Sequence, residues 1–369
     1  MNRSNWIKNN ARLFLILLLL LTIAGCNMPA STPTSDLFAT LQASTPLGGS
    51  PAAPTDFATI APSLTPEAGV STPTLTPQTP VVTGEVPAPS PADGLTGHIV
   101  FTCQLFKTQA TDQVCIMNAD GSGYRQLTTK TDVRNFYPSL APDGKSLVYS
   151  RFRQENLMEI REYNLLNGSE IRLTDKLGVA VAPEISPDGN TIIFTLWTAE
   201  NQQYQIWAMD RDGANPHRIR KILGWDLTWS PTGEQILFAS TDTDGRNQLF
   251  AMDANGANKY RISSLPSIRG RSDWSPDGQS IVTYSGEAWH REVFIMNTGG
   301  SGTRQLTPTG GNSQGPSFSP DGKWVVFTAY FDNYGDDHGC EIYIIRTDGS
   351  DLRRLTNNDY CDYQPRWGP

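Results

Sequence analysis

The sequence is poor in the side chains that most catalytic and metal centres use. Its 369 residues contain four histidines and five cysteines. The histidines have neither H-x-x-x-H nor H-E-x-x-H spacing, and the cysteines include no C-x-x-C pair. These absences argue against a zinc centre of either kind. We also expect no serine-hydrolase elbow with its following Asp and His, so a non-enzymatic role is favoured.

Positive charge is scarce as well. The chain has 29 Lys and Arg against 37 Asp and Glu, a formal net charge of −8. Proteins that bind nucleic acid need a basic surface to contact the phosphates. We therefore expect no nucleic-acid partner.

Long apolar runs are missing except near the N-terminus. Residues 13–25 are largely apolar and follow three basic residues, but 13 residues are too few to span a bilayer as a helix. The run ends in "LTIAGC", which resembles the lipobox of bacterial lipoproteins. We predict a lipoprotein signal peptide over residues 1–25 and lipidation of Cys26. A plain signal peptide with an incidental cysteine is the alternative.

The next segment, residues 26–95, has the composition of a spacer. Between residues 27 and 95 lie 13 of the 26 prolines, and there is no Lys or Arg. Stretches such as "STPTLTPQTP" cannot build a packed core and favour extended conformations. We predict a disordered Pro/Thr/Ser-rich stalk that holds residues 96–369 off the membrane. The chain would then be extracytoplasmic, with its lipid anchored in the cell membrane or at the cell surface.

One turn and one strand recur along residues 96–369. "SPDGKWVVF" has four relatives, and the turn prolines are 44 or 45 residues apart, at Pro142, Pro187, Pro231, Pro276 and Pro320. Proline presets φ for a tight turn and the glycine supplies a positive φ, and we expect Asp321 and its equivalents to cap these turns. A period of this length with several strands in each unit is typical of a β-propeller.

The count of units predicts how the ring closes. There are six third strands but only five Pro-Asp/Thr-Gly turns, and the C-terminal "RWGP" aligns with the turn sequence at Trp229. The C-terminal strand should therefore complete the first blade, which begins at "GHIVFT". We predict an all-β fold: a six-bladed β-propeller of four-stranded antiparallel blades, closed by the C-terminal strand. We expect the propeller to be monomeric.

These repeats resemble a known family. "SPDGKWVVF" and "IYIIRTDGSDLRRLT" are similar to the WD40-like repeats of TolB-type β-propellers, and the resemblance covers essentially all of residues 97–369. TolB carries an α/β domain before its propeller where this chain has the stalk, so a role in the Tol system is not implied. Related propellers accompany serine peptidases and form some pectate-degrading lyases, so the fold alone names no function.

Four cysteines remain after Cys26. An even number in an oxidising compartment indicates two disulfides, with three possible pairings. The repeat places all four on one rim near the seam of the ring: Cys103 and Cys115 flank a loop of the first blade, Cys340 closes the corresponding loop of the last blade, and Cys361 lies in the loop that returns to the closing strand. We favour Cys103–Cys115 and Cys340–Cys361, with a metal site as the rival interpretation.

We expect no cofactor. The acidic loop "FDNYGDDHG" contains Asp332, Asp336 and Asp337, whose oxygens would suit calcium. Ordinary solvated turns explain the same residues and are the favoured interpretation.

Comparison of the repeats separates two ends of the predicted ring. One end carries short, similar turns, and the other carries long loops that differ in every blade. Binding residues usually lie on variable loops held by a rigid scaffold. Aromatic and cationic side chains there suit sugars, carboxylates or an extended peptide. The ligand-binding candidates on these loops are Arg134, Tyr137, Arg151, Arg153, Trp225, Arg269, Arg271, Trp289, His290, Tyr330, Tyr334 and Tyr363.

Two functions follow. The favoured one is a membrane-anchored, non-enzymatic binding module for an envelope protein, peptide or glycan. The alternative is an extracellular carbohydrate-active enzyme, such as a lyase of a uronate polymer, that uses the arginines with His290 or His338. Four scattered histidines fit the lyase poorly.

Overall fold

The computed structural model describes residues 94–104, 111–130, 132–268, 270–330 and 340–369. All of them lie in the unit Val82–Pro369. Every regular element among them is a β-strand, and in this part of the chain no helix is long and apolar enough to span a membrane. The predicted signal peptide, Cys26 and the stalk up to residue 93 lie outside the described residues.

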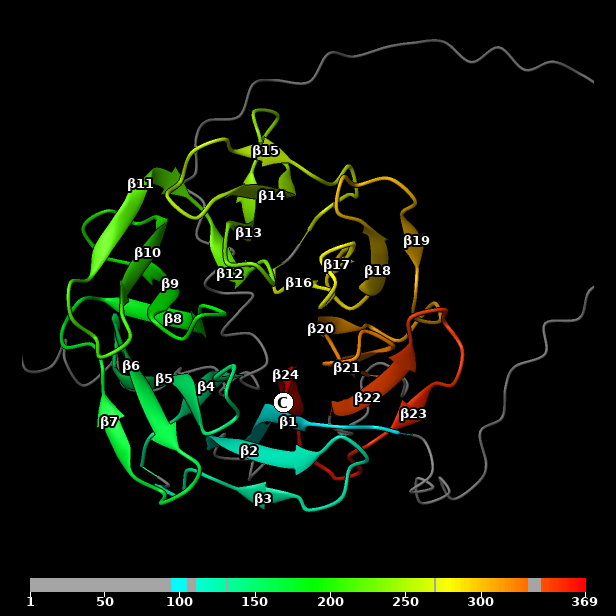
Figure 1. Cartoon of the computed structure of the whole chain (residues 1–369), viewed down its shortest axis with the longest axis horizontal. Helices are drawn as coiled ribbons and strands as arrows, with labels where there is room; N and C mark the ends of the chain where they lie inside the picture. The colour runs from blue at the N-terminus through cyan, green and yellow to red at the C-terminus, as the bar shows by residue number, and fades with distance from the viewer. Residues whose placement is uncertain (1–93, 105–110, 131, 269, 331–339) are drawn as a thin grey trace, which may run out of the picture. The chain divides into compact units, whose positions relative to one another are not determined.

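Four sheets of four antiparallel strands surround a common centre (Figure 1). In their order of hydrogen bonding, the strands are β24 (Asp362–Gly368), β1 (His98–Gln104), β2 (Asp112–Asn118) and β3 (Arg125–Gln126); β12 (Trp225–Trp229), β13 (Gln235–Thr241), β14 (Asn247–Asp253) and β15 (Tyr260–Arg261); β16 (Asp273–Trp274), β17 (Ser280–Ser285), β18 (Glu292–Asn297) and β19 (Arg304–Gln305); and β20 (Gln314–Phe318), β21 (Trp324–Ala329), β22 (Glu341–Arg346) and β23 (Arg353–Arg354).

The fifth sheet has eight strands. These are β4 (Asn135–Leu140), β5 (Ser146–Gln154), β6 (Leu157–Asn164), β7 (Glu170–Arg172), β8 (Val179–Ile185), β9 (Thr191–Trp197), β10 (Tyr204–Asp210) and β11 (His217–Leu223). One parallel residue pair, Met158 with Val179, joins β6 to β8. The prediction of a propeller with four-stranded antiparallel blades is thus confirmed, but only four blades are separate sheets, because this pair merges the remaining eight strands.

The repeated turn forms as its sequence predicts. Asp321 Oδ1 accepts hydrogen bonds from the Ser319 hydroxyl at 2.6 Å and the Lys323 N–H at 3.1 Å. Asp277 makes the equivalent pair of bonds. Gly322, at a φ of 71°, takes the left-handed conformation that favours glycine. The predicted capping role of Asp321 is confirmed.

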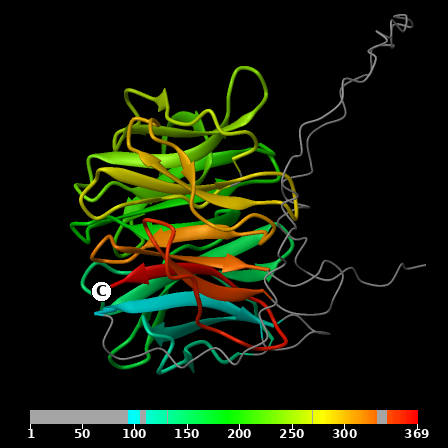
Figure 2. The same cartoon turned by 90° about the vertical axis from the view of Figure 1, so that its right-hand side faces the viewer.

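The antiparallel order gives the sheets two different ends, which Figure 2 shows from the side. We call the end with the Pro-Asp-Gly turns and the turns between third and fourth strands the turn face. The opposite end, the loop face, holds the connections between second and third strands and those between successive blades.

The C-terminal strand closes the ring as predicted. Strand β24 pairs with β1 in antiparallel register, with Ile99 opposite Trp367. The Trp367 indole N–H donates to the Thr96 carbonyl at 2.9 Å. A side chain at Gly97 would meet the Gly368 carbonyl oxygen at 2.2 Å, so only glycine fits at this closure.

The core lies between the faces of neighbouring sheets. Ile99, Phe101 and Met117 of one sheet pack against Trp324 and Ile342 of the next, and all are nearly or fully buried. Burial of each such side chain contributes roughly 1.5–3 kcal/mol. Packing of this kind fixes the inner strands, and through them the positions of the residues described below.

Both predicted disulfides form. Cys103 pairs with Cys115, with their Cα atoms 5.8 Å apart, and Cys340 pairs with Cys361 at 4.4 Å. The first joins β1 to β2, and the second ties the residue directly before β22 to the residue directly before β24. Disulfides persist in oxidising compartments, so they favour an extracytoplasmic location.

Candidate functional site

The middle of the ring is occupied by charged side chains from the innermost strands and from the segment directly before β16. We call Glu184, Asp226, Arg271, Asp273 and Arg366 the central network. The Arg366 Nη2 atom of β24 lies 3.3 Å from Glu184 Oε2 of β8, and its Nη1 atom lies 3.8 Å from Asp273 Oδ2 of β16. Since Arg366 is 5% exposed, one guanidinium cross-links three inner strands inside the protein.

Arg271 makes the second set of links across the centre. Its Nη1 and Nη2 atoms donate to the backbone carbonyls of Gln364 and Pro138, at 3.0 and 3.1 Å. Its guanidinium lies 5.4 Å from the centre of the Tyr137 ring. Burial, with help from the neighbouring Arg366 charge, lowers the pKa of Arg271 to about 10.

These contacts correct the prediction for Arg271 and Tyr137. The two residues are only 4% exposed and join inner strands, so neither belongs to an open ligand surface. Burial, which outweighs every other influence, raises the pKa of the Tyr137 hydroxyl well above its usual value.

The acidic members of the network are also shifted by burial. Burial raises the pKa of Glu184 and of Asp226, although Arg366 and Arg271 oppose the respective shifts. The Thr228 hydroxyl and the Trp229 N–H donate to Glu184 Oε1 at 2.7 and 3.1 Å. Paired and hydrogen-bonded in this way, the network is suited to holding the ring together.

Sequence reasoning missed the network, although a repeated signal points to it. Tyr137, Ala182, Asp226 and Gln364 each precede a turn proline or Pro369 by five residues, and all have φ between 52° and 56°. The strand register shifts beside each of them. This recurring bulge changes the direction of the side chains near the centre.

Two predicted residues meet at the seam of the loop face. Arg134 Nε donates to Asp112 Oδ2 at 2.7 Å, and the Tyr363 hydroxyl donates to Asp112 Oδ1 at 2.6 Å. The Arg134 guanidinium also lies 5.0 Å from the centre of the Phe136 ring. Burial, and then Asp112, raises the pKa of Tyr363 well above its usual range. Asp112, which the sequence did not single out, organises this group.

Arg151 and Arg153 have different environments. Arg151 is 2% exposed and donates to Asn135, Tyr149 and Glu170. The prediction that Arg151 lines the ligand surface is therefore wrong. The Arg153 side chain is 44% exposed and its Nε atom lies 3.5 Å from Glu159 Oε1.

The aromatic candidates lie at the boundaries between sheets. Trp289 and Tyr330, from neighbouring sheets, meet edge to face with ring centres 5.6 Å apart. Trp225 packs against Tyr204, with ring centres 6.2 Å apart. His290 is exposed, and its Nδ1 atom lies 3.3 Å from the Ala288 carbonyl oxygen.

Some predictions fall on other parts of the chain. Arg269, Tyr334 and the calcium candidates Asp332, Asp336 and Asp337 lie outside the described residues, as does His338. Within the described ranges, no group of three His, Cys, Asp or Glu side chains is arranged to hold a metal ion.

One stretch carries the letters of a hydrolase elbow but not its structure. Residues 311–315, "GNSQG", match the letters G-x-S-x-G. Ser313 is fully buried and its N–H donates to the Arg291 carbonyl at 2.6 Å, directly before β20. A nucleophile elbow needs an exposed serine on a strand-to-helix turn, so this match is not one.

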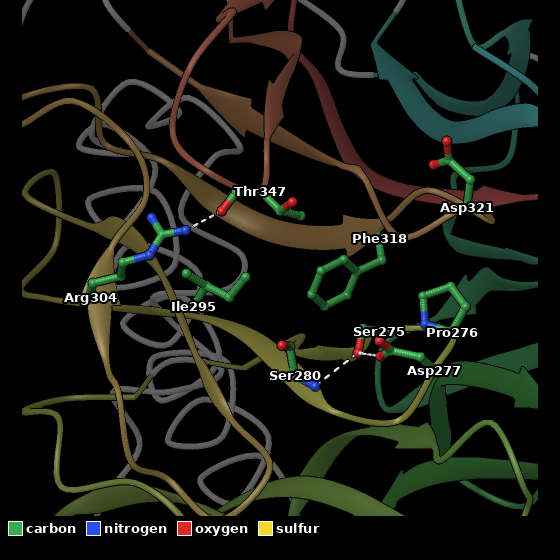
Figure 3. A pocket seen from close by; sticks show the side chains of 10 residues that line it. Ser275, Pro276, Asp277, Ser280, Ile295, Arg304, Phe318, Asp321 and Thr347 are labelled. Carbon is green, nitrogen blue, oxygen red and sulfur yellow. Dashed lines mark hydrogen bonds between the residues drawn. The ribbon is translucent and has the colours of Figure 1, made fainter. Parts of the chain in front are cut away.

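A pocket opens on the turn face between β16–β19 and β20–β23 (Figure 3). Its volume is about 550 Å³. Phe318 and Ile295 form an apolar wall of the pocket. Arg304 lies at one side of the pocket, and Asp277 and Asp321 lie at the other. The Arg304 guanidinium already donates to the Thr347 carbonyl, and both carboxylates cap their own turns. The polar groups of this pocket therefore serve the turns.

Comparisons with known proteins agree with this architecture. The family described as the TolB beta propeller domain matches residues 95–369. The Tol-Pal system protein TolB of Alcanivorax borkumensis is 34% identical over 84 residues, which are 21% of this chain and 19% of that protein. The uncharacterized peptidase YuxL of Bacillus subtilis is 26% identical over 200 residues, or 52% of this chain and 29% of that protein.

A solved structure is similar over a longer range. The crystal structure of TolB from Acinetobacter baumannii is 25% identical, with a TM-score of 0.65, and the match covers 74% of this chain and 67% of that chain. By contrast, the matches to these two curated relatives span less than a third of their own length.

Proposed function

Because the chain belongs to the TolB beta propeller domain family over residues 95–369, we propose that it presents this propeller outside the cytoplasm as a non-enzymatic binding module. The ligand is an envelope protein, peptide or glycan, and it binds at the loop face. Lipid on Cys26 anchors the chain in the membrane, and the stalk of residues 26–95 holds the propeller away from it.

We also propose that the propeller has six blades. The eight-stranded sheet would then represent two of them, β4–β7 and β8–β11. Each of these runs has the antiparallel order of the separate sheets, and only the Met158–Val179 pair joins them.

The observation that carries the binding proposal is the difference between the two faces. The turn face repeats one turn, whose aspartates are satisfied within the turn itself. The loop face offers different groups in each blade, such as the half-buried Trp289–Tyr330 pair and the half-exposed Arg153. Side chains of this type suit a specific ligand, and the cross-linked inner strands hold them rigidly.

Site-specific photo-crosslinking in cells that produce the full-length protein tests this proposal. A photo-reactive residue in place of His290 samples the loop face, and one in place of Leu166, which is 77% exposed on the turn face, is the matched control. We expect adducts from position 290 and few from position 166. Adducts from position 166 alone, or equally from both, would contradict the assignment of the loop face.

Replacement of the lipidation site tests the anchor separately. In cells supplied with a labelled fatty acid, the parent protein should become labelled and sediment with membranes, whereas Cys26→Ala should do neither. A Cys26→Ala variant that remains labelled would exclude this residue as the lipid site.

The polysaccharide-lyase alternative stays a prediction. Of its two histidines, His290 has its Nδ1 atom beside a backbone carbonyl, and His338 lies outside the described residues. Release of unsaturated uronate, measured by its ultraviolet absorbance, would favour the enzyme over the binding module.

A further inference from the structure

One face of strands β5, β6 and β7 carries an unusual concentration of arginine. Tyr149 lies opposite Arg161, and Arg151 lies opposite Glu159, so these residues share a face of the sheet. Arg161 in turn lies directly opposite Arg172 of β7. We call the following residues the arginine cluster: Arg151, Arg153, Arg161, Arg172, Glu159 and Glu170.

The inner part of the cluster is internally satisfied. Arg151 Nη1 donates to Glu170 Oε2 at 3.1 Å, and Arg151 Nη2 donates to the Tyr149 hydroxyl at 2.9 Å. The Tyr149 hydroxyl donates to Glu170 in its turn. These three side chains hold β5 and β7 together and leave no role for a ligand there.

The outer part of the cluster is different. Arg153 and Arg172 are 44% and 46% exposed, and both approach the same atom, Glu159 Oε1, at 3.5 and 3.6 Å. Arg161 Nη2 lies 3.3 Å from the other oxygen of Glu159, whose side chain is only 4% exposed. Three guanidinium groups therefore surround one buried carboxylate, and two of them are only loosely paired with it.

The charges of the cluster do not balance. It has four arginines and two glutamates, and the exposed carboxylate of Asp175 lies 3.1 Å from Arg172. Like charges directly opposite one another, as in the Arg161–Arg172 pair, destabilise an antiparallel sheet. In a chain with a net charge of −8, a bound anion would neutralise this positive surface.

We propose that Arg153 and Arg172 bind an oxyanion, the carboxylate or phosphate group of an envelope polymer, at the loop end of β5 and β7. Each guanidinium presents five N–H donors in a planar fork that matches such groups. Because both arginines reach one oxygen of Glu159, a single oxyanion can bridge them and displace the exposed Asp175. This inference rests on the proposed function and gives the ligand of the loop face its chemistry.

Calorimetric titration of the full-length protein in detergent at low salt tests the site. The probes are an oligogalacturonate for carboxylates, a glycerol phosphate oligomer for phosphates and a neutral glucan oligomer as the control ligand. We expect at least one anionic probe to bind and the glucan not to bind. Binding of only one anionic probe shows whether the site takes a carboxylate or a phosphate group. Binding of neither probe overturns the proposal.

Three variants locate the binding. Arg153→Gln with Arg172→Gln should weaken it on the order of 10- to 100-fold, because two charge-assisted contacts are lost. Arg153→Lys with Arg172→Lys keeps the positive charges but lacks the planar guanidinium groups. Its affinity for the anionic probe should lie between those of the parent and the Gln pair. The matched control is Arg261→Gln, since Arg261 is 52% exposed beside one carboxylate at 3.5 Å, and it should bind like the parent.

The outcomes are distinguishable from those of the crosslinking test. Equal binding by the parent and the Gln pair would overturn the site, provided that both show the same thermal unfolding. Adducts at position 290 without binding of either anionic probe would contradict this inference and still support the proposed binding function. Failure of both experiments would remove the two proposals together.

Discussion

Buried acidic side chains in this propeller differ in what compensates them. Glu184 faces Arg366 and two hydrogen-bond donors. Asp362, which is 1% exposed, accepts a hydrogen bond from the Asn358 amide at 2.8 Å but lies near the like charge of Glu341. Burial and then Glu341 therefore raise the pKa of Asp362 to about 7.

The titration of Asp362 should be visible in stability. Below its unfolded value of 3.8 the acid is protonated in both states. Between pH 3.8 and about 7 the folded state keeps a proton that the unfolded state has already released, so stability falls across this window and levels off above it. The loss attributable to this group is at most on the order of 4 kcal/mol.

Asp362→Asn isolates this effect, because the amide mimics the protonated acid. Urea unfolding between pH 4 and pH 8 should show a smaller loss of stability in the variant than in the parent. The same pH dependence in both proteins would show that Asp362 does not hold the proton.

Arg366 gives a second prediction at this scale. Arg366→Met removes the ion-pair partner of the buried Glu184, which should lower the free energy of unfolding by roughly 3–5 kcal/mol. Addition of Glu184→Gln to that variant removes the uncompensated charge and should restore part of the loss. A double variant less stable than Arg366→Met would argue against the pairing, and both are measured by urea unfolding.

Among the elements, the closing strand depends most on residues distant in sequence. Strand β24 pairs with β1, and its Trp367 packs among Ile99, Met117 and Trp324. Trp229 occupies the same repeat position within the chain, and its indole N–H donates to the Glu184 carbonyl at 3.4 Å. These two tryptophans therefore allow closure to be compared with ordinary packing.

Trp367→Ala should destabilise the protein by roughly 3–5 kcal/mol. Because the chain ends meet there, hydrogen exchange should increase first in β1 and β24. Trp229→Ala should lower the free energy of unfolding by a similar amount, but the increase in hydrogen exchange should be greatest in β12 and β8. Identical exchange patterns in the two variants would contradict a specific closing role for β24.

At the scale of the whole molecule, the ring is held by closure, by the central network and by two disulfides. Both disulfides lie beside the seam, where the first and last sheets meet. A covalent link there limits how far the chain ends can separate when the propeller opens.

Removal of each disulfide should therefore lower stability, by about 2–4 kcal/mol. Cys340→Ser with Cys361→Ser should also speed exchange in β24, whereas Cys103→Ser with Cys115→Ser should act on β1 and β2. Urea unfolding and exchange measurements check both. If these variants lose neither stability nor protection from hydrogen exchange, the seam does not depend on the disulfides.

The repeat predicted much of this architecture because its information is local. The Pro-Asp-Gly turn requires only neighbouring residues, and the 44- or 45-residue period placed the four cysteines on one rim near the seam, where they proved to be paired. Arg151 and Arg271 were misjudged because both lie in variable segments, where an arginine that faces solvent and one that faces the centre look alike in sequence.

The sequence by itself determined the β-rich repeat, the turn chemistry and the strand that closes the ring, since each follows from periodic patterns and chain order. It favoured the disulfide pairing that the structure shows without excluding the other pairings. Tertiary structure alone decided which charged side chains meet. The 182 residues between Arg366 and Glu184 and the shared approach of Arg153 and Arg172 to Glu159 depend on bulges and on sheet packing. Those set side-chain direction through contacts between distant segments, which no local pattern records.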